Sequence, residues 1–380
     1  MYPPARMTRI AVIGAGAFGG WIALQLRRRG AEVVLVDAYG PGNSRSSSGG
    51  ETRVIRAVYG PDRVYVELVK RAYELWDELQ ATTGEQLYVE TGTLWFNRED
   101  ASYVEASAPI LRELGFPIDQ LSIADAKQRY PQVDFTGVRS VWLEHRAGAL
   151  SARKACVAVR DAFEKAGGTY RMEHVDPQAP GIDADAYVYA CGPWLGRLFP
   201  EVLGEWIRPT RQEVYFFGTP PGSQRYLPSQ MPVWLDFGER IFYGIPDTDG
   251  RGFKIADDTR GEPIDPTSAE RTPDAAGIAR ARTLLAERFP ELAHAPLLEA
   301  RVCQYENSPD GHLLLDRHPG ADNIWFAGGG SGHGFKLAPA VGELVARAVL
   351  DGAELPRMFR LDVTRITKPA TQFERAHKGD

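Results

Sequence analysis

The sequence predicts an α/β fold (α+β overall) with a Rossmann-like dinucleotide-binding domain and a second domain built on a largely antiparallel sheet. Three observations support this prediction. Residues 8–37 form a strand, glycine turn, helix and second strand in that order, and strands alternate with helices again in residues 151–194 and 323–348. From residue 211, strands separated by turn dipeptides dominate. The 380 residues, 43% of them hydrophobic, suffice for two or three domain-sized units.

The first unit opens with an apolar, β-branched run at residues 8–13, which is typical of a buried parallel strand. A helix with one apolar face follows the glycines, and Gly30 lies where it should end. The second strand, residues 32–36, is followed by Asp37. This order is typical of a dinucleotide-binding βαβ unit.

Three glycines and the acid have distinct roles in such a unit. Gly14 permits the tight turn, Gly16 lets backbone amides approach a pyrophosphate, and Gly19 lets the helix pack close to the strand. Asp37 can accept hydrogen bonds from a ribose hydroxyl. Because all these parts occur in order, the sequence favours a dinucleotide site over an ordinary glycine-rich turn.

Residues 40–56 are rich in glycine and serine, which by composition is typical of a flexible linker. The segment nevertheless follows a strand end of the nucleotide fold, where ligands bind. It ends in Arg53 and Arg56, which would be neighbours if the segment were helical. The two cations suggest a bound anion, and a solvated basic pair explains the pattern equally well.

The remaining chain divides into elements by hydrophobic periodicity and turn signals. Helices are predicted at residues 64–80, 101–114, 151–166 and 273–288, and after the glycines of residues 328–334, with Pro339 near the first turn. Strands are predicted at residues 93–96, 137–144, 186–190, 214–217, 233–237, 241–244, 252–256, 297–306 and 323–327.

Charge and composition exclude several classes of protein. A net charge of −6 argues against nucleic acid as the main partner, because phosphate binding needs a basic surface. Residues 1–7 contain no apolar signal region, and no apolar run is long enough to span a bilayer. We therefore expect no membrane partner and a cytoplasmic location.

The three cysteines, Cys156, Cys191 and Cys303, are far apart in the sequence. Their number and spacing indicate neither a disulfide framework nor a metal site, so we expect no metal. On pattern alone, each cysteine is explained as a small buried hydrophobic residue.

Three separated motifs, at residues 52–56, 301–312 and 330–336, carry a more specific resemblance. The first reads TRVIR, the second reads RVCQY with SPDGH behind it, and the third reads GSGHGFK. Together they resemble the monomeric sarcosine oxidase and N-methyltryptophan oxidase family, within the larger group of flavoenzymes related to D-amino-acid oxidase. The resemblance extends from about Ile10 to about Gly352.

The resemblance implies a monomeric two-domain enzyme that binds FAD. It implies oxidation of the C–N bond of an N-alkyl or cyclic secondary α-amino acid, with O₂ as acceptor and an imine and H₂O₂ as products. By this resemblance, residues 1–83, 148–208 and 312–380 form a discontinuous Rossmann-like FAD-binding domain, and residues 84–147 and 209–311 form the substrate domain.

The resemblance also implies which residues bind FAD. Cys303 matches the cysteine that joins the flavin 8α position through a thioether, and Arg53 matches an arginine close to the flavin ring. The full set of expected cofactor-binding residues is Gly14, Gly16, Gly19, Asp37, Ser47, Thr52, Arg53, Val175, Gly192, Cys303, Gly332, Gly334, Phe335 and Lys336.

For substrate binding, Arg56 and Lys336 match the pair that holds the substrate carboxylate, a task suited to a planar guanidinium and a point charge. Tyr243 and Tyr305 match tyrosines that line the substrate cavity, although a tyrosine is more often a packing residue. Lys254 matches the lysine that assists the reaction of reduced flavin with O₂ through a water molecule. On pattern alone, Lys254 would be a solvent-facing strand residue.

The sequence departs from the family pattern in two places. Asp258 replaces an active-site histidine of sarcosine oxidases, so a larger or cationic N-substituent is favoured over sarcosine, and Asp258 joins Lys254, Arg53 and Tyr243 as an expected catalytic residue. Residues 175–185 are too few for the strand pair that the family usually inserts there.

Two other functions are compatible with the sequence. One is a dehydrogenase or biosynthetic tailoring enzyme of the same fold, which acts on an amine derived from an amino acid and passes electrons to a partner. The other is a flavin- or NAD-binding protein without redox turnover.

Overall fold

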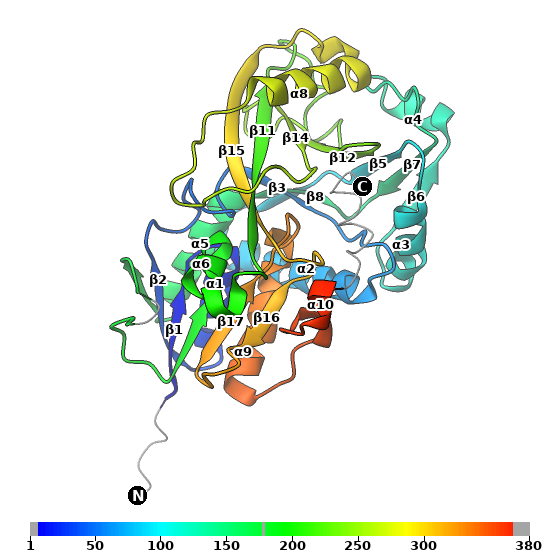
Figure 1. Cartoon of the computed structure of the whole chain (residues 1–380). Coiled ribbons are helices and arrows are strands. Elements are labelled where there is room, and N and C mark those ends of the chain that lie inside the picture. The colour runs from blue at the N-terminus through cyan, green and yellow to red at the C-terminus, as the bar shows by residue number, and fades with distance from the viewer. Residues whose placement is uncertain (1–6, 177–178, 368–380) are drawn as a thin grey trace, which may run out of the picture.

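Two large β-sheets lie at opposite ends of the molecule in the computed structural model, which describes residues 7–176 and 179–367 (Figure 1). A six-stranded sheet occupies the lower half of that view and an eight-stranded sheet the upper half. A small sheet that contains β3 and β8 lies between them.

The six-stranded sheet is the nucleotide-type sheet that the sequence predicts. In spatial order it contains β16 (Leu314–Arg317), β17 (Ile324–Gly328), β10 (Ala186–Tyr189), β1 (Arg9–Ile13), β2 (Glu32–Asp37) and β9 (Thr169–Met172). Neighbouring strands are parallel except β16 and β17. The parallel strands therefore end at one common edge, where ligands bind in such sheets.

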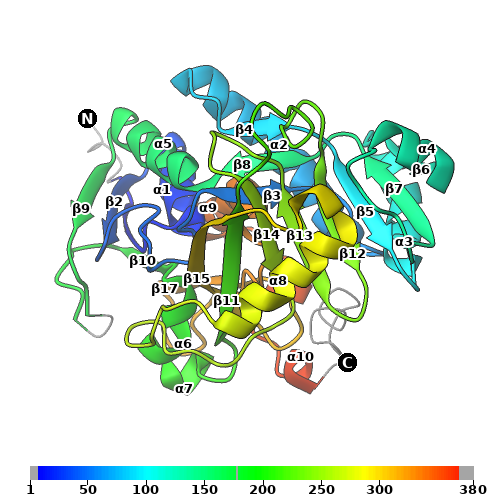
Figure 2. The ribbon, with the colours of Figure 1, turned by 90° about the horizontal axis from the view of Figure 1, so that it is seen from above.

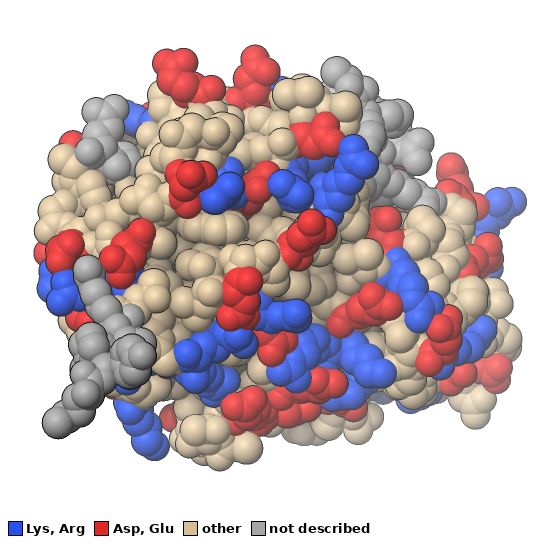
Figure 3. All heavy atoms as spheres, turned by 90° about the horizontal axis from the view of Figure 1, so that it is seen from below, with Lys and Arg blue, Asp and Glu red and all other residues tan. Residues whose placement is uncertain are grey.

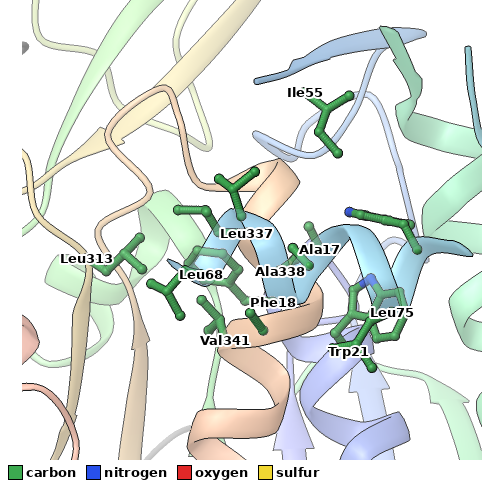
Figure 4. Close-up of a cluster of buried hydrophobic side chains, with 14 of the residues drawn as sticks. Ala17, Phe18, Trp21, Ile55, Leu68, Leu75, Leu313, Leu337, Ala338 and Val341 are labelled. Atoms are coloured by element: carbon green, nitrogen blue, oxygen red, sulfur yellow. The ribbon is translucent and has the colours of Figure 1, made fainter. Parts of the chain in front are cut away.

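Side chains alternate between the two faces of this sheet, as a strand requires. Ile10 and Val12 join the core under α1 (Ala17–Arg28), α2 (Arg63–Thr83), α5 (Ala152–Lys165) and α9 (Ala338–Asp351). Ala11 and Ile13 join a separate core on the other face, with the short helices α6 (Leu195–Leu198) and α7 (Pro200–Leu203). Figure 4 shows the first core, with Phe18, Trp21 and Val341 among its side chains.

The eight-stranded sheet is largely antiparallel, as predicted. Its order is β15 (Leu297–Asn307), β11 (Arg208–Phe217), β14 (Phe253–Asp257), β13 (Ile241–Ile245), β12 (Val233–Phe237), β5 (Thr93–Asn97), β7 (Ser140–Glu144) and β6 (Ile118–Leu121). Only β12 and β5 pair in parallel among its described neighbours. Helix α8 (Ala275–Arg288) crosses it in Figure 2 and packs on its apolar core, and α3 (Ser102–Glu113) and α4 (Ile123–Arg129) lie near β6 and β7.

The small sheet contains β3 (Thr52–Ile55), β8 (Gly148–Ser151) and β4 (Tyr88–Glu90). The segment with Arg53 is a strand, so the helical condition considered for Arg53 and Arg56 is not met. Residues three apart in an extended chain point to opposite sides. Arg53 and Arg56 therefore do not become neighbours through helical spacing, although the cavities described below bring both to one wall.

Short elements complete the chain: η1 (Gly192–Trp194), η2 (Pro290–Leu292), η3 (Phe335–Leu337), η4 (Arg357–Phe359) and α10 (Thr364–Thr367). Between β9 and β10, the described residues form only an isolated bridge between Asp176 and Ala179, in keeping with the shortened segment that the sequence indicates. Residues 1–6 and 368–380, which the expected domain division assigns to the FAD-binding domain, lie outside the described residues.

Two properties of the whole molecule bear on its partners. Within residues 7–176 and 179–367, we find no helix that combines the length and the apolar character needed to cross a membrane. Acidic and basic side chains are interspersed over the face that Figure 3 shows. That face presents no continuous basic surface of the kind that binds a nucleic acid backbone.

Candidate active site

Two adjoining cavities lie where the carboxyl ends of the parallel strands meet the eight-stranded sheet. The larger has a volume of about 470 Å³ and the smaller about 50 Å³. Both are lined by Arg53, Tyr305, Gly332 and Phe335. A ligand that fills the large cavity therefore reaches the wall of the small one.

The turn from β1 into α1 lines part of the large cavity, and a side chain at Gly14 or Gly19 would clash with the backbone. Gly14 has a φ of +103°, and a Cβ atom there would lie 2.4 Å from the Ala190 carbonyl oxygen. A Cβ atom at Gly19 would lie 1.7 Å from the Gly14 carbonyl oxygen. The predicted roles in the tight turn and in close helix packing agree with these contacts.

Helix α1 begins after Gly16, which provides no side-chain cap for its amides. Ser48 partly replaces the cap, since the Ala17 amide donates to its Oγ at 2.9 Å. The Ala15 amide donates to Asp37 Oδ2 at 2.7 Å, and two further amides donate to Oδ1. The helix terminus thus offers positive potential to the cavity, while the backbone fixes the Asp37 carboxylate at its rim.

The expected cofactor residues fall into two groups. Those that line the large cavity are Gly14, Gly16, Asp37, Ser47, Arg53, Val175, Gly192, Gly332, Gly334 and Phe335. Gly19, Thr52, Cys303 and Lys336 are absent from its lining. Gly19 acts through packing, Lys336 lines the small cavity, and Thr52 and Cys303 contact side chains of the site.

Two cations, Arg56 and Lys336, line the small cavity and are each only 3% exposed. The Tyr59 ring lies against both, 4.8 Å from the Arg56 Cζ and 5.0 Å from the Lys336 Nζ. Burial and the charge of Arg56 hold the pKa of Lys336 well below its ordinary value. An anion in this cavity would relieve that repulsion, so the pair suits a carboxylate ligand.

Two acidic side chains accompany these cations. Glu144 is fully buried behind Arg56, and it accepts hydrogen bonds from the Ala57 amide and, at 3.3 Å, from Trp95 Nε1. Burial raises the pKa of Glu144 to about 7, against the opposing effects of the Ala57 amide and Arg56. Asp258 lines the small cavity itself, together with Lys336.

Tyr305 connects Asp258 to the wall shared by the cavities. Its hydroxyl donates to Asp258 Oδ1 at 2.6 Å, and the Arg260 guanidinium lies 5.2 Å from its ring centre. Arg260 also donates to the Ser331 carbonyl oxygen at 2.8 Å. These contacts fix the tyrosine ring, and Tyr243 completes the small-cavity lining that the sequence predicts.

Lys254 is 2% exposed, so the interpretation as a solvent-facing strand residue is wrong. Its Nζ donates to the Thr52 carbonyl oxygen at 3.0 Å and to Thr52 Oγ1 at 3.3 Å, and it lies 5.5 Å from the Tyr243 ring centre. Burial, with the nearby charge of Arg53, lowers the pKa of Lys254 to about 7. The amine therefore changes charge near neutral pH.

Arg53 is held in place by backbone carbonyl groups. It donates to the carbonyl oxygens of Thr52, Ser47 and Gly49 at 2.8, 2.7 and 2.5 Å. The Cys303 Sγ atom lies 4.0 Å from Arg53 Nη2. Cys303 is partly exposed and free, so it differs from the buried-hydrophobe interpretation.

Cys156, in contrast, fits the interpretation as a small buried hydrophobic residue, because it is free and 4% exposed.

Several residues of the site carry no signal in the sequence. Glu144 and Arg260 lie outside the motifs, and Glu306 lies between the two segments of the second motif, RVCQY and SPDGH. These residues meet the other site residues only through strand pairing or loop packing. His333 also lines the small cavity, and the glycine motif that contains it could have identified it.

Comparison with known proteins determines the family. A model of FAD-dependent oxidoreductases matches residues 9–348. The chain belongs to this family of FAD-dependent oxidoreductases. The predicted resemblance and the α/β fold are thereby confirmed, and FAD is the dinucleotide.

Individual members of the family cover nearly the whole chain. A monomeric sarcosine oxidase of a Bacillus species is 30% identical, over 90% of this chain and 92% of its own. An N-methyl-L-tryptophan oxidase of Salmonella arizonae is 28% identical, over 90% and 94%. The solved L-proline dehydrogenase of P. horikoshii shares the fold at a TM-score of 0.78 and 22% identity, over 93% and 95%.

The large cavity fits FAD by its own chemistry. Its glycine turn and helix terminus suit a diphosphate. Ser47 Oγ and Glu306 Oε2 are buried in the lining and have no hydrogen-bond partner among the described residues. Unpaired buried polar atoms are costly, and the hydroxyl groups of a bound FAD could pair with them.

Proposed function

We propose that this FAD-dependent oxidoreductase is an amine oxidase that acts on the C–N bond of an N-alkyl or cyclic secondary α-amino acid. O₂ is the acceptor, and the products are an imine and H₂O₂. The observation that carries the proposal is the pair of buried cations, Arg56 and Lys336, in a small cavity whose wall is shared with the cofactor cavity.

In this proposal Arg56 and Lys336 bind the substrate carboxylate from two sides. A guanidinium can bind it through two parallel hydrogen bonds, and the lysine adds a point charge. With the acid group fixed, the neighbouring C–H bond is oriented toward the cofactor cavity, and orientation is a large part of the catalytic effect. FAD, when bound, supplies the electron-accepting chemistry.

We propose that Asp258 selects the amine substituent. A carboxylate in the small cavity, held by Tyr305 at 2.6 Å, favours a substrate with a larger or cationic N-substituent over sarcosine. A cationic N-substituent could pair with the Asp258 carboxylate, while the substrate carboxylate pairs with Arg56 and Lys336. Tyr243 and Tyr305 then shape the cavity around the substituent.

Lys254 is the proposed group that assists the reaction of reduced flavin with O₂. When protonated, its buried ammonium can stabilise negative charge that develops on oxygen. The alternative is a dehydrogenase or tailoring enzyme, and the fold leaves both open because an L-proline dehydrogenase shares it. Replacement of Lys254 by Met discriminates: an oxidase should lose flavin reoxidation far more than flavin reduction.

We further propose that Cys303 is joined to the flavin 8α position. Its sulfur lies beside Arg53, which lines both cavities, and this proximity supports the assignment. The yellow colour should remain with the protein after acid precipitation and should be released from Cys303→Ala. Such a pellet would also exclude a protein that binds only NAD.

The decisive experiment uses the purified enzyme with a panel of N-alkyl and cyclic secondary α-amino acids. Anaerobic bleaching of the flavin identifies the substrates, and peroxide formation in air identifies the acceptor. Bleaching without peroxide would indicate a dehydrogenase. A flavin that no amine reduces would contradict both and leave a binding protein without redox turnover.

We also propose that the chain divides into the two domains that the resemblance implies, that it is monomeric and that it is located in the cytoplasm. Light scattering of the purified holoenzyme tests the monomeric state, and a mass of two chains would contradict it.

A further inference from the structure

Glu306 lies near the end of β15 and lines the large cavity, and the family resemblance assigns it no role. The residue is 9% exposed, and its Oε2 atom has no hydrogen-bond partner among the described residues. Its Oε1 atom accepts one long hydrogen bond, 3.4 Å from the Gly330 amide. Burial raises the pKa of this carboxyl group to about 8. The side chain is thus incompletely satisfied by the protein.

Glycines create the space that Glu306 occupies. A Cβ atom at Gly330 would lie 2.9 Å from Oε1, and one at Gly192 would lie 3.3 Å from Oε2. Both glycines also line the large cavity. The carboxyl group therefore stands between two strand ends and lines the large cavity.

The order of the strands indicates which part of FAD lies there. Along the common edge the strands follow the order β17, β10, β1 and β2. The diphosphate belongs at the β1–α1 turn, and Asp37 marks the adenosine side at the end of β2. Gly192 follows β10 and Gly330 follows β17, on the opposite side of β1. At about 4.8 Å per strand, a position between the ends of β10 and β17 puts Glu306 roughly 7 Å from the diphosphate position.

The ring of the flavin belongs farther along the same direction. Tyr305 and Phe335 line both cavities, so the wall beside the small cavity is where a ring must lie to meet the substrate. The part of FAD between its diphosphate and its ring is a chain of hydroxyl groups. A carboxyl group suits hydroxyls, because it accepts from them when ionised and can donate to them when protonated.

We propose that Glu306 binds the hydroxyl groups of the sugar-alcohol chain of FAD and thereby positions the flavin ring. Asp37 would fix the other end of the cofactor, so that one carboxyl group stands on each side of the diphosphate. An ionised carboxylate next to the diphosphate would be repelled, which agrees with the separation of Glu306 from the β1–α1 turn.

The test measures cofactor binding and does not depend on turnover. In a Cys303→Ser background, FAD binds reversibly whether or not the natural link forms. We expect Glu306→Leu to weaken FAD binding by roughly 10- to 100-fold, because it removes hydrogen bonds to a carboxyl group. Glu306→Gln keeps hydrogen-bonding atoms and should remain within a few-fold of the background. Glu299→Leu, on the same strand but outside both cavity linings, is the matched control and should bind FAD normally.

Analogues of FAD that lack single hydroxyl groups in the chain locate the contact. At least one analogue should bind more weakly than FAD to the protein that contains Glu306. The same analogue should bind the Glu306→Leu protein no more weakly than FAD does, because the contact is already lost. Equal losses for every analogue in both proteins would overturn the proposal. Normal FAD binding by Glu306→Leu would overturn it too. Equally weak FAD binding by Glu306→Gln and Glu306→Leu would overturn it in favour of a structural role for Glu306.

Discussion

Lys254 holds its amine in a buried position between β14 and β3, where it titrates far from its ordinary range. Because its pKa is lowered to about 7, the charged form predominates below that pH and the neutral form above it. We predict that flavin reoxidation by O₂ slows as the pH rises from about 6 to about 8. Stopped-flow reoxidation measures this rate. Lys254→Arg keeps the charge and should remove the pH dependence, whereas a rate that rises with pH would contradict the assignment.

Arg56 offers a second prediction at the residue scale. Arg56→Lys keeps the charge but loses the planar pair of donors. We expect KM for the substrate acid to rise by roughly 10- to 100-fold, since the two parallel hydrogen bonds to the carboxylate are lost, while flavin reduction at saturation changes less. Stopped-flow reduction separates the two quantities. Arg317→Lys, half-exposed at β16, is the control. An unchanged KM would remove Arg56 from the carboxylate site.

The element scale is best tested at the contact between β1 and α1. Gly19→Ala forces a methyl group to 1.7 Å from the Gly14 carbonyl oxygen, so the helix must shift. We predict a loss of about 3 kcal/mol in unfolding free energy, with loss of FAD, as for a severe overpacking change. Gly20→Ala is matched, because its methyl group would meet only a Val159 methyl at 3.2 Å. Denaturant unfolding measures the loss of stability, and flavin content measures the loss of FAD. Equal behaviour of the two variants would contradict the prediction.

A buried ion pair connects the end of the described chain to the segment after β15. Arg365 and Asp310 are 3% and 5% exposed in their side chains and make two hydrogen bonds of 2.8 Å. We predict that Arg365→Met costs about 3–5 kcal/mol, because it leaves a buried carboxylate unpaired. The double variant Asp310→Leu/Arg365→Met should recover much of that loss. Thermal unfolding compares them, and a double variant less stable than the single one would contradict the prediction.

The pH dependence of this pair has a definite sign. Burial raises the pKa of Asp310, but the Arg365 hydrogen bond and charge outweigh it and lower the pKa overall. Its contribution to stability is therefore present above the unfolded pKa of about 3.9 and is lost only as the pH falls through the lower folded value. In Arg365→Met the unpaired acid should instead become more destabilising as the pH rises.

At the scale of the whole molecule, both large sheets contribute walls to the cavities. Ile13 comes from the six-stranded sheet, and Leu235 and Tyr305 come from the eight-stranded one. FAD should therefore stabilise both parts together. We expect this from Cys303→Ser protein that has been freed of FAD. FAD added at about 100 times its Kd should increase the free energy of unfolding by about 2.7 kcal/mol and raise the temperature of a single transition shared by both parts. Calorimetry tests this, and a shift confined to one of two transitions would contradict it.

The sequence predicts well whatever depends on local pattern. The glycine turn, the apolar face of α2 and the antiparallel strands all follow from spacing of 3.6 or 2 residues and from turn chemistry. The pattern fails where tertiary packing decides. Lys254 has the pattern of an exposed strand residue and is buried, and the segment with Arg53 becomes a strand because β8 pairs with it.

Long-range contacts explain the missed site residues. Glu144 meets the Ala57 amide across 87 positions, and Arg260 meets Ser331 across 71. No local periodicity encodes such a meeting. The family motifs supply Arg56 and Lys336, the wider resemblance supplies Tyr243, and the structure adds that the three share one cavity.

The common wall of the two cavities limits how the enzyme can be redesigned. A mutagenesis library at Tyr305 or Phe335 would alter the flavin environment along with substrate choice, because both residues face the two cavities. Val54, Leu235 and Asp258 line only the small one. Randomisation restricted to those positions should yield altered amine preference in proteins that keep their colour.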